Sequence, residues 1–254
     1  MKILNSLFLL TSLVSCQSIN SPRVNSQNCI ECDASNVGDV FTLNGVEYLV
    51  VDKSNLEYKL SLGEDITNVC TSKITDMSEL TKDKFGVWPL PIQGDISRWD
   101  VSNVTDMNNM FIAQSDFNQD ISDWDVSNVT DMHQMFRFAT SFNQDIGDWD
   151  VSKVTDMFEM FFYANNFNQD IGDWNVRKVT NMNIMFAFAY NFNQDIGDWN
   201  VRRVRYMNNM FSAAYQFNQD LTGWCVSSFS GIPYEFSNSS ALSAANHPLW
   251  GTCP

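Results

Sequence analysis

The sequence predicts an α/β repeat solenoid in which every 25-residue unit contributes one short parallel strand and one short helix. Two observations support this fold class. Tryptophan recurs every 25 residues, at positions 99, 124, 149, 174, 199 and 224. A Met-x-x-Met-Phe motif keeps the same step and begins at Met107, Met132, Met157, Met182 and Met207. Because this period lies in the range of solenoid repeats, we expect residues 71–223 to form one degenerate unit and five complete units.

Each unit contains a strand signal followed by a helix signal. Residues 121–126 carry Ile-x-x-Trp-x-Val, which is the L-x-x-L-x-L spacing of a leucine-rich-repeat strand. Residues 129–139 place apolar side chains at three- and four-residue steps, which is typical of the buried face of a short helix. Because one unit cannot offset the conformational entropy of ordering its own backbone, neighbouring units must share a core. The pattern therefore predicts a leucine-rich-repeat-like stack.

Both ends of the stack are predicted to be capped. Residues 40–43 and 46–51 flank Asn44-Gly45, a strong hairpin signal, and residues 54–62 are expected to form a short helix. These elements predict an N-terminal cap over residues 39–70. Residues 224–254 begin a further strand but lack the methionine motif, so they are expected to form a C-terminal cap. Such caps cover the open core and the free strand edges of a solenoid.

The repeat resembles that of a known family. The pattern Phe-Asn-Gln-Asp-Ile-x-x-Trp-Asp-Val-Ser-x-Val-Thr-Asp-Met-x-x-Met-Phe occupies residues 117–136 and 142–161. It is similar to the repeat of the BspA-like leucine-rich-repeat surface proteins, and the resemblance covers about residues 39–254. It implies a bacterial cell-surface protein, often adhesive, with no catalytic residues to transfer. Arg205-Tyr206 departs from the Thr-Asp or Thr-Asn of other units, so a different helix cap is expected there.

The N-terminus has the features of an export signal. After Lys2, residues 3–14 form an apolar run that is too short to span a bilayer but fits the core of a signal peptide. The run closes in Leu-Val-Ser-Cys, ending at Cys16, which resembles the bacterial lipobox and implies lipidation of Cys16. We therefore expect a signal peptide over 1–15, a Ser- and Asn-rich tether over 16–38, and lipid anchoring in the bacterial envelope, at the outer membrane or cell surface. An ordinary secretory signal is the alternative.

The remaining cysteines would lie in an oxidising compartment, where disulfides form. Cys225 and Cys253 both belong to the C-terminal cap and are predicted to pair. Cys29-x-x-Cys32 could imitate a redox or metal motif, but it lies in a polar segment without a nearby histidine. A structural bridge, such as Cys32 to Cys70, is preferred, and one cysteine is then left over.

Composition and repetition argue against several functions. The net charge of −15 makes nucleic acid a poor partner, and two histidines leave little for histidine catalysis or a zinc site. Aspartates recur at 95, 120, 145, 170, 195 and 220. Turn hydrogen bonding explains such a column better than calcium, because the glycine-rich calcium-loop signature is absent. No enzyme activity and no cofactor are expected, since a catalytic carboxylate pair is normally unique rather than repeated.

The binding surface is expected where the repeat varies. On the predicted strand face the outward charges change from acidic to basic along the stack, at Asp123, Asp125, Asp148, Asp150, Arg177 and Arg202. This gradient would form a charged docking face for a protein, or reflects drift among solvated positions.

A second variable set is aromatic and consists of Phe158, Phe162, Tyr190 and Tyr215. Exposed together, these rings would form a binding patch; burial under the N-terminal cap or tether is the alternative. The sequence thus favours a surface-anchored adhesion or protein-recognition module that contacts the membrane through its lipid. A polysaccharide-binding module and a structural spacer are the alternatives.

Overall fold

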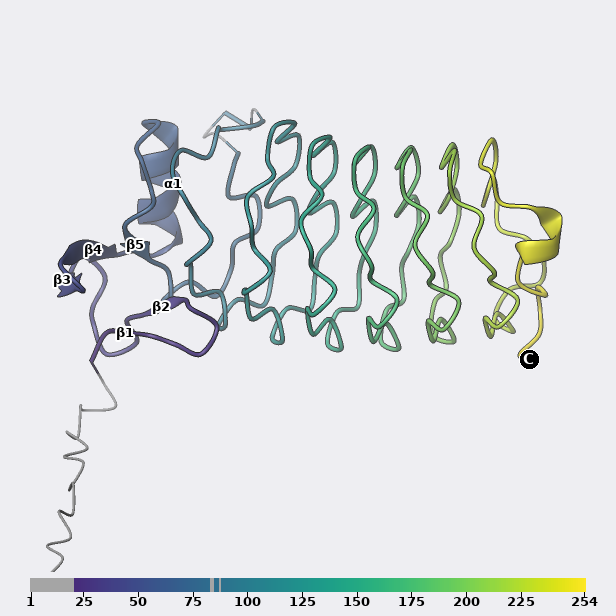
Figure 1. Cartoon of the computed structure of the whole chain (residues 1–254), viewed down its shortest axis with the longest axis horizontal. Coiled ribbons are helices and arrows are strands. Elements are labelled where there is room, and N and C mark those ends of the chain that lie inside the picture. The colour runs from purple at the N-terminus through teal and green to yellow at the C-terminus, as the bar shows by residue number, and fades with distance from the viewer. Residues whose placement is uncertain (1–20, 83–84, 87) are drawn as a thin grey trace, which may run out of the picture.

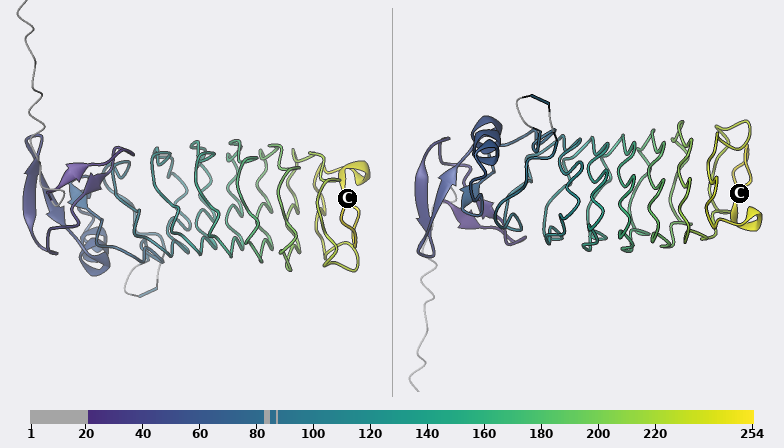
Figure 2. Two further views of the ribbon diagram at one scale, coloured as in Figure 1. Left: turned by 90° about the horizontal axis from the view of Figure 1, so that it is seen from below. Right: turned by 90° about the horizontal axis from the view of Figure 1, so that it is seen from above.

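The computed structural model describes residues 21–82, 85–86 and 88–254. Successive coils lie side by side in chain order, with the elements β1–β5 and α1 at one end and the C-terminus at the other (Figure 1). The views from below and above show the same single row of coils (Figure 2). The predicted signal peptide and the lipidation site Cys16 lie outside the described residues.

The N-terminal cap has the predicted hairpin and helix. Strands β3 (Val40–Leu43) and β4 (Val46–Val50) pair antiparallel around Asn44-Gly45, whose φ angles are +53° and +81°. Asparagine and glycine tolerate this left-handed backbone better than other residues, so the turn follows directly from the sequence. Helix α1 (Lys53–Ser61) begins where the Asp52 carboxylate accepts a hydrogen bond from the Asn55 amide. Strand β5 (Val69–Cys70) then pairs parallel with β4.

Part of the predicted tether is folded, so that prediction is wrong for residues 23–32. Strands β1 (Arg23–Val24) and β2 (Ile30–Glu31) form an antiparallel pair, and Ile30 also bridges Trp99 of the first complete unit. Burial of Ile30 and the Cys32–Cys70 disulfide hold this segment against the stack. The disulfide confirms a structural bridge in this segment and identifies Cys70 as the partner of Cys32, which the sequence had left open.

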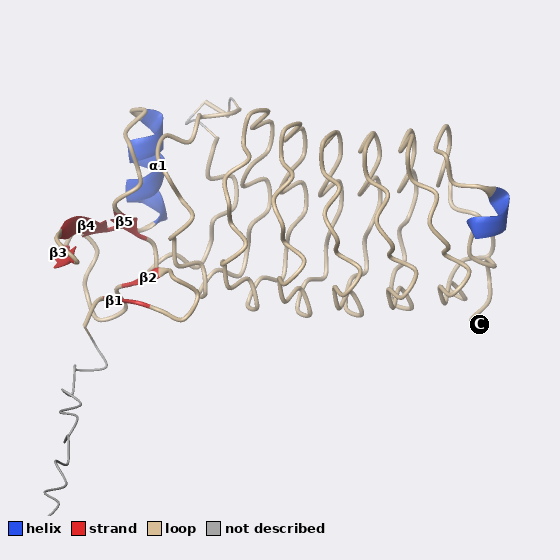
Figure 3. Cartoon of the chain, viewed as in Figure 1, coloured by secondary structure: helices blue, strands red, loops and turns tan. Residues whose placement is uncertain are grey.

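Within the repeats the backbone differs from the prediction. Between residues 71 and 243 the described chain has no helix and no extended strand, and Figure 3 shows these coils as loops. The segments 121–126 and 129–139 consist of turns and irregular backbone, with one bridge residue at Asp131. Single parallel bridges join the units instead, in a row formed by Asp76, Asp106, Asp131, Asp156, Asn181 and Tyr206.

The hydrogen bonds explain this difference. The amide of Gln134 donates to the Phe158 carbonyl of the next unit at 2.7 Å, and the amide of Phe138 donates to Phe162 at 2.8 Å. Both donors have left-handed backbones, with φ of +56° and +60°. A helix requires right-handed dihedrals and bonds within its own segment. Alternating residues therefore direct their amides to the neighbouring unit, while the apolar spacing that suggested a helix still fills the core.

The core is a set of continuous columns along the stack. The recurring tryptophans, methionines and phenylalanines of the complete units are almost fully buried. Each tryptophan ring also bonds to the preceding unit; for example, Trp149 Nε1 donates to the Ile121 carbonyl at 3.2 Å. Phenylalanine rings stack between units, as Phe136 and Phe161 do at 5.7 Å. Stability is therefore shared among neighbouring units.

Polar columns satisfy the backbone at the rim of the core. An asparagine ladder runs through the stack, in which each side-chain oxygen accepts the backbone amide one unit later, at Asn118, Asn143, Asn168, Asn193 and Asn218. The aspartate column forms turns, because each carboxylate accepts an amide two residues on, as Asp145 does from Gly147 at 3.0 Å. The turn interpretation is confirmed. No cluster of three metal-binding side chains occurs in the described part of the chain.

The C-terminal cap closes the last unit. The Cys225–Cys253 disulfide is confirmed, and the short helix η1 (Ala244–Asn246) follows Ser243, whose amide extends the asparagine ladder. Phe236 packs edge-on against both Phe211 of the last complete unit and Trp250. None of the helices in the described ranges has the length and apolarity needed to cross a bilayer.

Candidate binding surfaces

A row of partly exposed aromatic side chains crosses successive units. We call it the aromatic ridge, and it consists of Phe138, Phe162, Tyr163, Phe188, Tyr190 and Tyr215. The rings of Tyr163 and Phe188 stack with centroids 4.3 Å apart and planes 5° apart. Tyr190 and Tyr215 stack at 5.0 Å and 9°, and an edge-on contact at 6.2 Å joins Tyr190 to Tyr163. The ring contacts therefore run unbroken from Phe138 to Tyr215.

Half of the ridge occupies left-handed backbone positions. Phe138, Tyr163 and Phe188 have φ of +60°, +57° and +58°. The same column holds Ala113 and Ala213 in other units, at +59° and +55°. A left-handed backbone costs a residue with a side chain about 1–2 kcal/mol, and a bulky ring there is uncommon. Since alanine completes the coil at either end of the column, the fold does not require the rings.

Sequence analysis found three of the six ridge residues, namely Phe162, Tyr190 and Tyr215. The left-handed column was missed because a helix was predicted there, and a helix contains no residues with positive φ. The detectable signal was the change from alanine to aromatic and back in that column, from Ala113 to Ala213. Phe158 is not part of the ridge: it is half-buried between His133 and Asn183 in its column, and among the described residues it contacts no other ring.

Stacking covers part of the ring faces in the ridge. Tyr163 has a stacked ring on each face, Phe188 and Tyr190 have one stacked neighbour each, and Tyr215 at the end of the row is 54% exposed. Burial, and then the neighbouring Tyr163 and Tyr215, raise the pKa of the Tyr190 hydroxyl. The Tyr190 hydroxyl is therefore neutral at neutral pH and can donate or accept hydrogen bonds.

A cation borders the other end of the ridge. The Arg137 guanidinium lies 4.8 Å from the ring centre of Phe138 and 5.3 Å from that of Phe162. Its Nε is 2.7 Å from a carboxylate oxygen of Glu159. The side-chain amide of Gln134 donates a hydrogen bond to the same oxygen. These contacts fix the guanidinium over the rings, where the cation–π interaction is favourable.

The basic residues gather on a different surface. Arg177, Lys178, Asn200, Arg202 and Arg203 line a cleft of about 360 Å³ that we call the basic cleft. The predicted Arg177 and Arg202 are thus brought together. They come from equivalent turns of successive units, 25 residues apart.

Two of the four acidic residues in the predicted gradient also have a structural role. Asp125 and Asp150 build turns, since each carboxylate accepts the amide two residues later, at 3.0 and 2.9 Å. Hydrogen bonds from Ser152 lower the pKa of Asp150, with smaller contributions from Lys153 and Lys178. Asp123 and Asp148 are exposed.

The column of Asp123 and Asp148 continues with the exposed Asp173 and Asp198. The sequence had suggested a change from acidic to basic residues across the whole face. The basic residues are instead confined to the turn.

Comparison with known proteins places the chain in a family. Residues 52–162, 83–188 and 144–249 each match one family model, described as Mycoplasma protein of unknown function, DUF285. The chain belongs to the DUF285 family. No curated protein and no solved structure was found to match it. Overlapping DUF285 matches are typical of a repeat domain, and the finer resemblance to BspA-like proteins stays a prediction.

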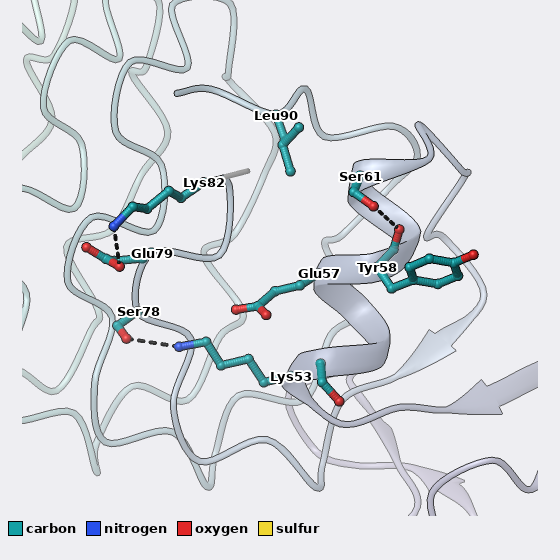
Figure 4. A pocket seen from close by; sticks show the side chains of 9 residues that line it. Lys53, Glu57, Tyr58, Ser61, Ser78, Glu79, Lys82 and Leu90 are labelled. Atoms are coloured by element: carbon teal, nitrogen blue, oxygen red, sulfur yellow. Dashed lines mark hydrogen bonds and ion pairs between the residues drawn. The ribbon is translucent and has the colours of Figure 1, made fainter. Parts of the chain in front are cut away.

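The DUF285 match also includes a cavity of about 430 Å³ between α1 and the degenerate unit (Figure 4). Lys82 pairs with Glu79 at 2.8 Å, and Lys53 bonds to Ser78 at 3.0 Å. Glu57 points from α1 into this space, and burial raises its pKa. The lysines are thus already engaged within the protein, and we assign no ligand to the cavity.

Among the described residues of this DUF285 protein, Cys29 is the cysteine without a disulfide. Burial, reinforced by Asp100 and Asp123, raises the pKa of its thiol to about 12. The thiolate is the reactive form, so Cys29 is inert at neutral pH. With Cys32 bonded to Cys70, the Cys29-x-x-Cys32 sequence does not form a redox pair.

Proposed function

We propose that the chain is a non-enzymatic recognition module on the bacterial cell surface, which binds a protein partner through the aromatic ridge. The proposal includes export, lipid attachment at Cys16 and a leucine-rich-repeat-like solenoid as the scaffold. The proposal rests on the aromatic side chains of Phe138, Tyr163 and Phe188. The equivalent position in other units is alanine. Side chains that the coil does not need, held in an unfavourable backbone conformation, point to selection for binding.

A protein fits the ridge better than a polysaccharide. Sugars bind aromatic residues by stacking on exposed ring faces, but Tyr163 has a ring stacked on each face, and Phe188, Tyr190 and Tyr215 each have one face covered by a stacked ring. Protein interfaces are enriched in tyrosine, phenylalanine and arginine, and their hot spots combine apolar area with a polar tip. Tyr163, Tyr190 and Tyr215 supply such tips, and Arg137 borders the row.

The proposal is tested with parallel arrays of extracellular proteins and glycans. We expect protein binding that persists as salt is raised and that falls at least tenfold in Tyr190→Ser/Tyr215→Ser, the typical loss on removing a hot spot. Serine occupies equivalent positions at Ser115 and Ser240, so the variant should fold.

Tyr58→Ser/Tyr234→Ser is the matched control, because these tyrosines are 65% and 68% exposed and lie outside the ridge. Loss of binding in the control as well would contradict a specific role for the ridge. Glycan binding that disappears in the ridge variant would support the polysaccharide alternative. Absence of binding on both arrays would favour the spacer.

A further inference from the structure

The basic cleft stands out when the units are compared with one another. The position of Arg177 and Arg202 is serine in the other units, at Ser102, Ser127, Ser152 and Ser227. The turn is the same in each case: the Asn200 side chain accepts the Arg202 amide at 3.3 Å, just as Asp125 accepts that of Ser127 at 3.0 Å. Serine therefore completes the turn, and the arginines serve no need of the fold.

The cations of the cleft also lack partners. Among the described residues, no carboxylate lies within ion-pair distance of Arg177, Lys178, Arg202 or Arg203. Arg205 differs, because its guanidinium donates to the carbonyls of Arg202 and Val204. In a chain of net charge −15, four unpaired cations in one cleft form a local reversal of the electrostatic field. Such a reversal attracts an anionic ligand.

We propose that the basic cleft binds a linear anionic polysaccharide carrying sulfate or carboxylate groups. Each arginine guanidinium can donate two parallel hydrogen bonds to two oxygens of a sulfate or carboxylate group. Asn200 adds a side-chain amide that can bond to sugar hydroxyls. The cleft residues are all polar and include no aromatic anchor, whereas a protein partner would need apolar hot-spot contacts.

The neighbouring charges favour a narrow ligand. Asp173 and Asp198 are exposed two residues before the turns that carry the cleft. A flat anionic bilayer or a DNA duplex would meet these carboxylates together with the cations and be repelled. A single polysaccharide strand can follow the cleft from unit to unit and avoid them.

The cleft and the aromatic ridge are separate surfaces. Arg177 follows Tyr163 by 177 − 163 = 14 residues, about half of a 25-residue coil. Half a coil leads from one row of loops to the row along the opposite edge, as Figure 1 shows. The two surfaces can therefore be occupied at the same time, and the polysaccharide site does not depend on the proposed protein site.

The test uses heparin as the probe and measures its binding to the purified full-length chain as NaCl is raised. We expect wild-type binding that weakens with salt. Arg177→Ser/Arg202→Ser should lose at least tenfold in affinity at low salt, and its slope of log K against log salt should be shallower by about 2, or about 1 for each cation removed. The melting temperature should not change, because serine is the residue of the equivalent units.

The matched control is Lys59→Ser/Lys82→Ser, which makes the same change in net charge outside the cleft. It should leave heparin affinity within about twofold of wild type. Equal losses in the two variants, or undiminished binding by the arginine variant, would overturn the proposal. So would the absence of heparin binding at low salt, or binding to phosphatidylserine vesicles or duplex DNA as tight as to heparin.

Discussion

The asparagine ladder predicts a sharp difference between substitutions of Asn168. Its side-chain oxygen accepts the Asn193 amide and the Gln194 side-chain amide, both at 2.9 Å. Asn168→Ala removes both bonds. Each contributes about 0.5–1.5 kcal/mol, and water only partly replaces an acceptor at a half-buried site. The free energy of unfolding should therefore fall by about 2 kcal/mol, or roughly 4–8 °C in melting temperature.

Two variants separate this bond loss from other effects. Asn168→Asp keeps an accepting oxygen of the same geometry, so it should stay within about 0.5 kcal/mol of wild type. Asn165→Ala deletes the same amide in the same unit, but its side-chain oxygen accepts no hydrogen bond, so it should also cost less than about 0.5 kcal/mol.

Urea denaturation followed by tryptophan fluorescence measures all three variants. Equal destabilisation by Asn168→Ala and Asn168→Asp would refute the argument, because the lost acceptor could not then be the cause. Equal destabilisation by Asn168→Ala and Asn165→Ala would refute it as well.

Three further predictions concern the turns, a titrating pair and the C-terminal cap. Ala113→Gly should raise the free energy of unfolding by about 1 kcal/mol, because glycine accepts φ of +59° without strain; an unchanged or lower value in urea denaturation would contradict the left-handed turn. The hydrogen bond to Asp131 raises the pKa of His133. The stabilisation of the folded state by protonated His133 is therefore present below about pH 6.5 and is lost as pH rises through the pKa of the folded state. His133→Asn should abolish this pH-dependent difference, which is below about 1 kcal/mol for a partly exposed pair; identical pH profiles of the two proteins would count against it. Cys225→Ser/Cys253→Ser should lower stability by about 3–4 kcal/mol in the chain-entropy model, given the sequence separation of 28; an unchanged melting temperature would show that the cap does not need the bridge.

Local signals in the sequence predicted the N-terminal cap well. Asn44-Gly45 allows few turns other than a tight hairpin, and the apolar pattern after Asp52 allows one short helix. The Cys225–Cys253 disulfide was predicted because both cysteines lie in the C-terminal cap, whereas Cys32–Cys70 was one structural bridge among the pairings that the sequence left open. Composition predicted a tether at residues 23–32, because the segment is polar overall, but the burial of Ile30 and the disulfide through Cys32 hold it against the stack.

The interior of the repeat could not be predicted in the same way. Apolar residues at three- and four-residue steps fit a helix, but they fit equally a set of turns whose amides bond to the next unit, as at Gln134 and Phe138. Only the stacked structure reveals these bonds. For the same reason the sequence found Phe162, Tyr190 and Tyr215 but not the left-handed column that completes the ridge. It predicted Asp125 and Asp150 as binding residues without showing that their carboxylates also accept hydrogen bonds within the turn.

The central claim is that the ridge rings serve a protein partner and not the fold. The most direct test is Phe138→Ala/Tyr163→Ala/Phe188→Ala, which gives the column the residue of Ala113 and Ala213 throughout. The variant should fold cooperatively, with a loss of about 1–3 kcal/mol from two stacked ring pairs in addition to that from the apolar area the three rings bury, and its affinity for the partner found on the array should fall at least tenfold. A variant that does not fold, or one that binds the partner as wild type does, would contradict the claim.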